Sequence, residues 1–374
     1  MSDNSSYVAP LKNINIYNFR NIKNLLFSPG PKLNIIYGNN AQGKTNLIES
    51  IWMFTGEKSF RKVRESELIL FGEKTAKLSL DFISNQRNQN AVIKWQPQKT
   101  IYLNKYKIET ITDFVGVFSA IIFSPEDLNL VKGGPVKRRN FLDIALSQIK
   151  SRYSKLLLEY NRILSQRNAL LKDILRHPAL IETLDIWDEV FSKIATKIIR
   201  YRLKYINALS PIAQDIYRGI SNQKEQLEIK YISSDNLDLD FNLDLEVLYK
   251  YFREKLIASR SLDIKSGFSQ IGPHRDDFKI TINNLSSKSF ASQGQQRSVV
   301  LSLKLAEARV LKNLVNKNPV ILLDDVMSEL DADRKKYILD FLKDTQCFIT
   351  CCDESYFKNC LCEARLFKIN DLVK

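Results

Sequence analysis

The sequence predicts an α/β protein with an inserted helical arm, and three observations support this prediction. An apolar run leads into the glycine-containing loop Gly38–Thr45, which is followed by apolar residues at helical spacing. A second apolar run, within residues 320–325, ends in two consecutive acids. Between these halves, residues 149–174 and 187–212 carry apolar side chains at heptad spacing. We therefore expect one α/β domain that is interrupted by a pair of long helices.

The loop has the pattern G-x-x-x-x-G-K-[ST], which cradles phosphates when a strand precedes it and a helix follows. Gly38 and Gly43 let the backbone curl without Cβ clashes. Lys44 is predicted to neutralise phosphate charge and the Thr45 hydroxyl to ligate Mg²⁺. A chance glycine turn before a helix is the competing interpretation. The nucleotide-binding residues predicted from this loop are Gly38, Asn39, Asn40, Ala41, Gln42, Gly43, Lys44, Thr45 and Asn46.

The two acids at the end of the second apolar run complete the predicted site. Asp324 is placed to hold Mg²⁺, directly or through water, and Asp325 to orient or deprotonate an attacking water. Many buried strands end in an acid, so this motif gains its meaning from the phosphate loop. Lys44 and Asp325 are thus the predicted catalytic residues, and Thr45 and Asp324 the predicted metal ligands.

Composition and charge limit the class of protein. A chain of 374 residues is long enough for two domains. Its net charge of +14 suits a polyanionic partner without distinguishing DNA from RNA or an acidic membrane surface. No apolar run approaches the ~20 residues needed to span a bilayer, and the N-terminus has no signal-peptide core. We therefore expect a cytoplasmic protein without a membrane partner.

The five cysteines gather near the C-terminus and form no C-x₂-C pair, which favours reduced thiols over a zinc site. They are Cys347, Cys351, Cys352, Cys360 and Cys362.

The remaining patterns describe the arm and the head. Pro178 separates the two heptad stretches, so they predict an antiparallel helical hairpin, with Arg167 filling the one gap in the first register. Residues 131–220 hold 17 Lys and Arg against 8 Asp and Glu, a net charge of +9. These charges fit either a polyanion-binding arm or the solvated face of ordinary long helices. Short β-like runs at 75–83, 91–96 and 100–106 predict an antiparallel meander.

Two further motifs lead to a family resemblance. Ser292-Gln293-Gly294-Gln295 opens an apolar-periodic helix, and Ser328–Asp331 follows the acid pair. Together with the loop and the acids, they resemble an ABC-type P-loop ATPase head of the SMC-like branch. The motifs Asn18–Asn21, Ser124–Leu128, Gly272–Asp277 and Ser292–Arg297 extend the resemblance, over nearly the whole chain, to the RecF family of bacterial recombination mediators.

The resemblance implies a mode of action. It implies ATP and Mg²⁺ as cofactors, ATP-dependent homodimerisation, binding at single-strand/double-strand DNA junctions in gaps, and recruitment of RecR to load recombinase. Ser292 and Gly294 would contact the γ-phosphate held by the other subunit, and Asp331 would cross the same interface. Arg20 would lie near the adenine, and Glu126 in the loop that corresponds to the Q-loop. The residues that the resemblance adds to the nucleotide site are Arg20, Glu126, Ser292, Gly294, Gln295 and Asp331.

Three departures from general ABC proteins refine this expectation. Gln293 replaces a glycine, as it does in RecF proteins, and Asp325 stands where most such enzymes use glutamate. The shorter side chain reaches a water less well, so we expect slow ATP hydrolysis. We expect no nuclease chemistry. No histidine follows residues 347–350, which leaves Thr350 or Asp353 as candidates for the role of the switch histidine.

The predicted domains are the N-terminal part of the head at 1–132, the arm at 133–265 and the C-terminal part of the head at 266–374. The predicted DNA contacts are Arg61, Lys62 and Arg64, in the basic segment after the phosphate-loop helix.

Two other functions compete with a DNA-binding ATPase of recombinational repair. One is an SMC-like ATPase subunit of a nuclease or chromosome-organising complex, and the other is an ABC transporter subunit. The short arm disfavours the first, because a 30-residue helix reaches only ~45 Å. The net charge and the arm disfavour the second.

Overall fold

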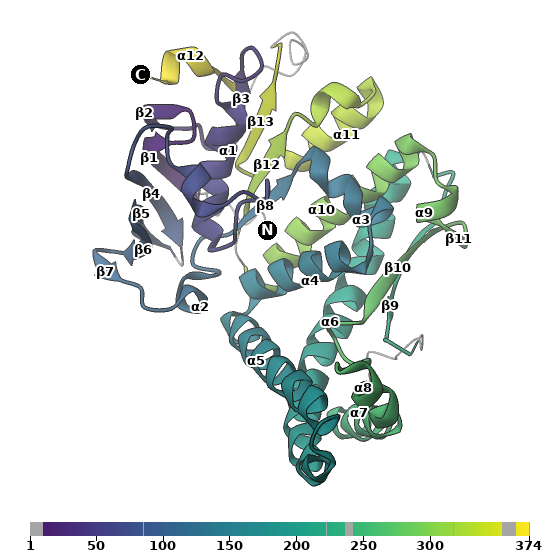
Figure 1. Cartoon of the computed structure of the whole chain (residues 1–374). Coiled ribbons are helices and arrows are strands. Elements are labelled where there is room, and N and C mark those ends of the chain that lie inside the picture. The colour runs from purple at the N-terminus through teal and green to yellow at the C-terminus, as the bar shows by residue number, and fades with distance from the viewer. Residues whose placement is uncertain are drawn as a thin grey trace. The chain divides into compact units, whose positions relative to one another are not determined.

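The computed structural model describes residues 10–84, 86–221, 223–235, 242–316, 318–353 and 364–373. The chain forms two compact units, one made of Met1–Asp127 with Leu303–Lys374 and the other of Leu128–Ser302 (Figure 1). The fold is mixed α/β, and a single helix-rich segment interrupts the first unit. The predicted fold class is therefore confirmed. None of the helices described is long and apolar enough to cross a membrane.

A five-stranded parallel sheet forms the centre of the first unit. Its order is β14-β3-β13-β12-β8, and all four pairings are parallel. Strands of a parallel sheet are buried on both faces, which explains why they read as unbroken apolar runs. Because their carboxyl ends meet at one edge, the phosphate loop and the acid pair reach the same place. The strands are β3 (Leu33–Tyr37), β8 (Ala120–Phe123), β12 (Val320–Asp324), β13 (Cys347–Cys351) and β14 (Ala364–Lys368).

A six-stranded antiparallel sheet, in the order β2-β1-β4-β5-β6-β7, forms a second layer of this unit (Figure 1). Residues such as Ile14, Leu78 and Ile93 are fully buried, whereas their neighbours along each strand are more exposed, so one face is packed and one is solvated. The predicted meander is confirmed as β4, β5 and β6. The strands are β1 (Leu11–Phe19), β2 (Ile22–Phe27), β4 (Ala76–Ser84), β5 (Arg87–Gln96), β6 (Gln98–Leu103) and β7 (Tyr106–Lys107).

Helices dominate the second unit, which also holds a small antiparallel sheet in the order β11-β10-β9. Strand β10 pairs with β9 along its whole length. Because of this pairing, residues 266–302 pack with the helices of the second unit, whereas the sequence prediction placed them in the head. The main elements are α4 (Pro135–Ile149), α5 (Ser151–Ile174), α6 (Leu184–Ile220), β9 (Leu227–Ile232), α7 (Leu245–Ala258), α8 (Arg260–Ser266), β10 (Asp277–Ile282) and β11 (Leu285–Ser286).

Short helices and one long helix complete both units. Helix α10 begins in the second unit and ends in the first. The other helices are α1 (Lys44–Trp52), α2 (Ile111–Phe114), α3 (Asn129–Lys132), α9 (Ser287–Phe290), α10 (Gln293–Val315), α11 (Ala332–Leu342) and α12 (Ile369–Leu372).

The two heptad stretches form α5 and α6, which a short 3₁₀ segment beginning at Pro178 connects. The predicted core positions Tyr153, Tyr160, Phe191 and Ile198 are buried. The helical hairpin that the sequence predicted is therefore present.

Arg167 occupies the gap in the apolar register of α5 and is completely buried. Its Nε donates to Asp188 of α6 at 2.8 Å, and its Nη1 donates to Asp263 of α8 at 2.8 Å. Its guanidinium also lies over the ring of Phe191, 5.5 Å from the centroid. Burial raises the pKa of Asp263, although the hydrogen bonds and the charge of Arg167 oppose this. One cation thus ties three helices together.

We expect Arg167→Ala to lower the free energy of unfolding by about 3–5 kcal/mol, because Asp263 and Asp188 lose a buried counter-charge. Urea unfolding followed by circular dichroism measures the loss. Arg162→Ala on the exposed face of α5 is the control and should change the stability by less than about 0.5 kcal/mol. Equal effects of the two variants would contradict a structural role for Arg167.

Candidate nucleotide-binding site

The loop between β3 and α1 has the backbone geometry of a phosphate cradle. Gly38 and Gly43 have φ values of 147° and 103°, and a Cβ at Gly38 would lie 2.5 Å from Gln42 Oε1. The Lys44 ammonium donates to the carbonyls of Gly38 at 2.6 Å and Asn39 at 2.8 Å. The loop therefore curls around this cation at the N-terminus of α1, where amides favour an anion.

A junction of two hydroxyls and one carboxylate connects the loop to the acid pair. Thr45 Oγ1 donates to Asp324 Oδ1 at 3.0 Å, and Thr350 Oγ1 donates to the same oxygen at 2.8 Å. Burial raises the pKa of Asp324, whereas the bonds from Thr350 and Thr45 oppose the rise. A hydroxyl beside one carboxylate is a donor set that Mg²⁺ accepts when phosphate oxygens complete its shell. The predicted metal ligands thus come together and fit the ion.

Asp325 differs from Asp324 in its surroundings. Asp324 is 5% exposed, whereas Asp325 is exposed and has a left-handed backbone with φ 54°. The Asp325 amide donates to Thr350 Oγ1 at 2.9 Å, so Thr350 of β13 contacts both acids. A buried acid at a hydroxyl and an exposed acid beside it suit the separate tasks of holding a metal and positioning water.

The turn between β1 and β2 is attached to the phosphate loop. Arg20 donates from Nε and Nη2 to the two carboxylate oxygens of buried Glu49, at 2.9 and 2.7 Å. Asn21 Nδ2 donates to the Ala41 carbonyl at 2.9 Å, and Asn46 Nδ2 donates to Asn21 Oδ1 at 2.6 Å. Asn21 and Glu49 are supporting residues that the sequence did not assign. An acid within the apolar helix after the loop was the available signal for Glu49.

The basic segment divides into two parts. Arg61 Nη1 donates to Asn46 Oδ1 at 2.8 Å and lies 3.8 Å from Glu49 Oε2, so this residue belongs to the surroundings of the phosphate loop. Lys62 and Arg64 are exposed. Lys62 and Arg64 therefore direct their charges to solvent, whereas Arg61 supports the phosphate loop.

The Ser292 motif begins α10 with reciprocal capping. The Gln295 amide donates to Ser292 Oγ at 3.2 Å, and the Ser292 amide donates to Gln295 Oε1 at 2.7 Å. The Gln295 side chain also donates to Glu225 at 2.6 Å, and Gly294 is half-buried in the first turn. Ser292 itself is exposed. These residues lie in the second unit.

Two more predicted residues lie in the first unit. Asp331 caps α11 by accepting from the Arg334 amide at 2.9 Å, and its side chain is 56% exposed. Glu126 is exposed in the turn that follows β8.

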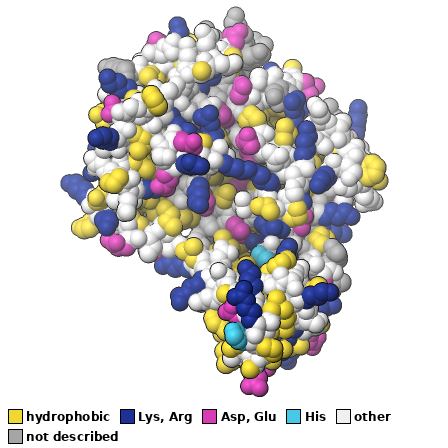
Figure 2. Space-filling view, in the orientation of Figure 1, with side chains coloured by type: hydrophobic (Ala, Val, Ile, Leu, Met, Phe, Trp, Pro, Cys, Tyr) yellow, Lys and Arg dark blue, Asp and Glu magenta, His cyan; other side chains and the backbone are white. Residues whose placement is uncertain are grey.

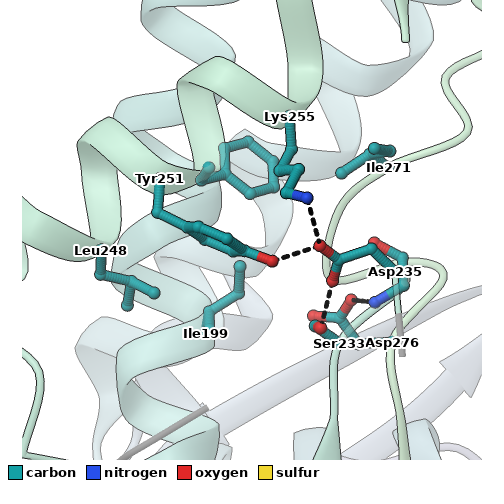
Figure 3. Close-up of a pocket in the computed structure, with 10 residues that line it drawn as sticks. Ile199, Ser233, Asp235, Leu248, Tyr251, Lys255, Ile271 and Asp276 are labelled. Carbon is teal, nitrogen blue, oxygen red and sulfur yellow. Dashed lines mark hydrogen bonds and ion pairs between the residues drawn. The ribbon is translucent and has the colours of Figure 1, made fainter. Parts of the chain in front are cut away.

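A small cavity in the second unit, between α6, α7 and the end of β9, is lined by none of the residues predicted for the site (Figure 3). Asp235 there accepts hydrogen bonds from Ser233 and Tyr251, and Lys255 Nζ lies 3.5 Å from the same carboxylate. Since these polar groups satisfy one another, we assign the cavity to the structure of the unit.

Three thiols lie on β13 or directly after it. Cys347 and Cys351 are buried and free, and burial raises the pKa of Cys351 to about 12. Exposed Cys352 donates to Asn40 Oδ1 of the phosphate loop at 3.1 Å. The described residues contain no cluster of three or more His, Cys, Asp or Glu suited to a metal ion. Cys360 and Cys362 lie outside the described residues.

Comparison with known proteins first defines the class. The family model of the RecF/RecN/SMC N terminal domain matches residues 10–373. The Smc head domain derived from Pyrococcus furiosus, solved bound to the C-terminal domain of ScpA, has a TM-score of 0.53 at 15% identity. That alignment covers 94% of this chain and 91% of that one. These matches define an SMC-like ATPase head.

More similar proteins narrow the class. The DNA replication and repair protein RecF of Ruminiclostridium cellulolyticum is 41% identical over 371 residues, covering 96% of this chain and 97% of that protein. RecF of Acetivibrio thermocellus is 39% identical and covers 91% and 93%. A solved structure of the recombination mediator protein RecF with ATP has a TM-score of 0.88 at 37% identity, covering 95% of both chains. This chain belongs to the RecF family, as its motifs predicted.

Proposed function

We propose that this protein is an ATP-dependent DNA-binding protein of recombinational repair and replication restart. In this proposal ATP closes a homodimer on single-strand/double-strand junctions at gaps, and slow hydrolysis reopens it. The observation that supports the proposal is the 3.0 Å hydrogen bond between Thr45 and Asp324, which brings together the phosphate loop and the acid pair from positions 279 residues apart. The RecF relatives named above, one of them solved with ATP, support the choice of nucleotide.

The residues of the first unit divide the work on ATP. The loop amides and Lys44 would hold the phosphates, and Thr45 with Asp324 would hold Mg²⁺. Bound Mg²⁺ supplies positive charge that offsets the charge developing on the phosphates. Asp325 would orient the attacking water. Arg20, fixed by Glu49, would keep one position beside the adenine.

The second unit would supply the other half of each site. Ser292 is exposed at the start of a 23-residue helix, where backbone amides and the helix dipole attract an anion. With Gly294, and with Asp331 from the first unit, it would approach the phosphate held by the partner subunit. ATP would then act as part of the dimer interface.

The charge of the protein supports a nucleic-acid partner. The net charge is +14, and residues 131–220 contribute +9 of it. Figure 2 shows Lys and Arg side chains scattered over the face in view. In the cytoplasm, the partner protein RecR would join the complex at the gap. The solved RecF, which acts in the RecFOR pathway, supports this choice of partner.

We expect Asp325→Asn to bind ATP and Mg²⁺ but to hydrolyse ATP at least about tenfold more slowly, since it loses a base while Asp324 still serves the metal. Phosphate release measures turnover, and a fluorescent ATP analogue measures binding. The trapped dimer should hold DNA longer. Unchanged turnover would show that another residue positions the water.

We expect Lys62→Ala/Arg64→Ala to weaken DNA binding equally for all sequences. The slope of log affinity against log salt should become shallower by about 0.9 for each lost phosphate contact. Anisotropy titrations at several salt concentrations test this. Arg61→Ala is the comparison, because its contact with Asn46 predicts weaker ATP binding as well. A double variant with wild-type affinity and slope would mean that these charges are only solvated.

The test of the whole proposal is Ser292→Arg, sized with ATP, with ADP and without nucleotide, in the presence and absence of gapped DNA. A bulky side chain at the shared site should leave an ATP-binding monomer that has lost most hydrolysis and DNA binding. Ser292→Ala removes only a helix cap, worth about 1 kcal/mol, and is the control for stability. Wild-type dimerisation of Ser292→Arg with ATP would refute the shared site.

A further inference from the structure

The antiparallel sheet of the first unit has a solvated side that the nucleotide site does not use. Side chains alternate between the packed and solvated sides along each strand, and the register brings the solvated ones into rows across the sheet. We call this set the outer sheet face. On its four central strands it includes Asn15 and Tyr17 of β1, Lys77, Ser79 and Asp81 of β4, Val92 and Lys94 of β5, and Thr100 and Tyr102 of β6.

Lysines and tyrosines are neighbours on this face. Tyr17 pairs with Lys77, Lys77 with Lys94, and Lys94 with Thr100. Lys94 Nζ also lies 5.2 Å from the ring centroid of Tyr102. Since adjacent strands lie ~4.8 Å apart, the strands of the two tyrosines are about 14 Å apart. Lys77 and Lys94 thus lie on the two strands between those of Tyr17 and Tyr102, and the Lys94 ammonium covers one face of the Tyr102 ring.

The charge of this face favours an anionic partner. Lys107, which pairs with Tyr102, adds a third lysine at the edge of the face, where its Nζ lies 3.7 Å from Glu109. Among the described strands of this sheet, Asp81 is the one acidic residue. It accepts a hydrogen bond from Asn90 at 2.7 Å. Tyr17 is 48% exposed, which leaves much of its ring accessible to a flat ligand.

An aromatic ring and a lysine side by side recognise a base and a phosphate at once. Single strands bind to such surfaces because each base offers a free π-face and each phosphate a charge, whereas a duplex hides its base faces. Polar, cationic and aromatic side chains alternate on this face, whereas an apolar protein partner would need a contiguous apolar patch.

We propose that the outer sheet face binds single-stranded DNA, with a base stacked on the exposed ring of Tyr17 and phosphates paired with Lys77 and Lys94. The inference rests on the proposed function only for the origin of the strand, which is the unpaired side of a gap. The face itself would bind without ATP, because its residues are already aligned by the register of the sheet.

The test is the affinity of Tyr17→Ala/Lys77→Ala for fluorescein-labelled oligothymidine of about 16 nucleotides, the upper site size of one such module. Anisotropy without nucleotide should show a loss of at least about fivefold, the lower limit for one stacked base. Phe71→Ala/Lys74→Ala is the matched control, since it removes an exposed aromatic and a lysine from a turn outside the sheet. ATP binding and thermal unfolding confirm that both variants fold.

An abasic strand of the same length separates stacking from charge. Wild-type affinity should fall on the abasic strand, whereas the Tyr17→Ala/Lys77→Ala variant should lose less. Equal wild-type affinity for both strands, or equal behaviour of the two double variants, would overturn the proposal.

Oligouridine RNA distinguishes the source of the strand. Comparable binding of RNA and DNA supports stacking, because that contact ignores the sugar, and binding of RNA alone overturns the assignment to DNA. If ATP fails to dimerise the wild type while oligothymidine binding still depends on Tyr17 and Lys77, the proposed function falls and this inference stands.

Discussion

The hydrogen bonds that Asp324 accepts from Thr45 and Thr350 are the interaction on which the nucleotide site depends. They join β12, β13 and the phosphate loop, whose segments are far apart along the chain. Burial raises the pKa of Asp324, and the two hydroxyl bonds oppose the rise. The parallel sheet brings these residues together, because the carboxyl ends of β3, β13 and β12 lie side by side at one edge.

Local rules made most of the head predictable. The glycine loop, the apolar parallel strands and the alternating meander each follow from residue type and spacing within a few positions. Thr350 could be named as a candidate but not placed, because its contact with both acids depends on the pairing of β12 with β13. Glu49 was missed for a similar reason, since its partner Arg20 lies in the turn between β1 and β2. The extent of the second unit depends on a pairing between β9 and β10 across about 50 residues, which spacing alone does not encode.

The Gly272–Asp277 motif was one of four that extended the resemblance to the RecF family, and in the structure it forms a polar network within the second unit. Gly272 has φ 138°, and a Cβ there would lie 2.8 Å from Tyr160 Oη. His274 Nδ1 contacts the same hydroxyl at 2.6 Å, and burial lowers the pKa of His274 to about 4. Asp276 accepts from Tyr231 at 2.5 Å, and burial raises its pKa to about 6. A family motif can therefore mark a buried polar network, and resemblance alone does not make its residues ligands.

Helix α10 connects the Ser292 motif of the second unit to a buried ion-pair cluster in the first unit. Its first turn carries the Ser292 motif, and its later turns carry Lys304, whose Nζ lies 3.4 Å from Glu307 and 3.7 Å from Asp127. Both Lys304 and Glu307 are buried, and the charges of Asp127 and Glu307 raise the pKa of Lys304 against the effect of burial. Asp127 follows Glu126 in the turn after β8. Helix α10 is therefore continuous from the Ser292 motif in the second unit to the ion pairs of Lys304 in the first. Removing both acids would leave the buried Lys304 charge without a counter-charge, so these ion pairs hold this end of α10 against the turn after β8.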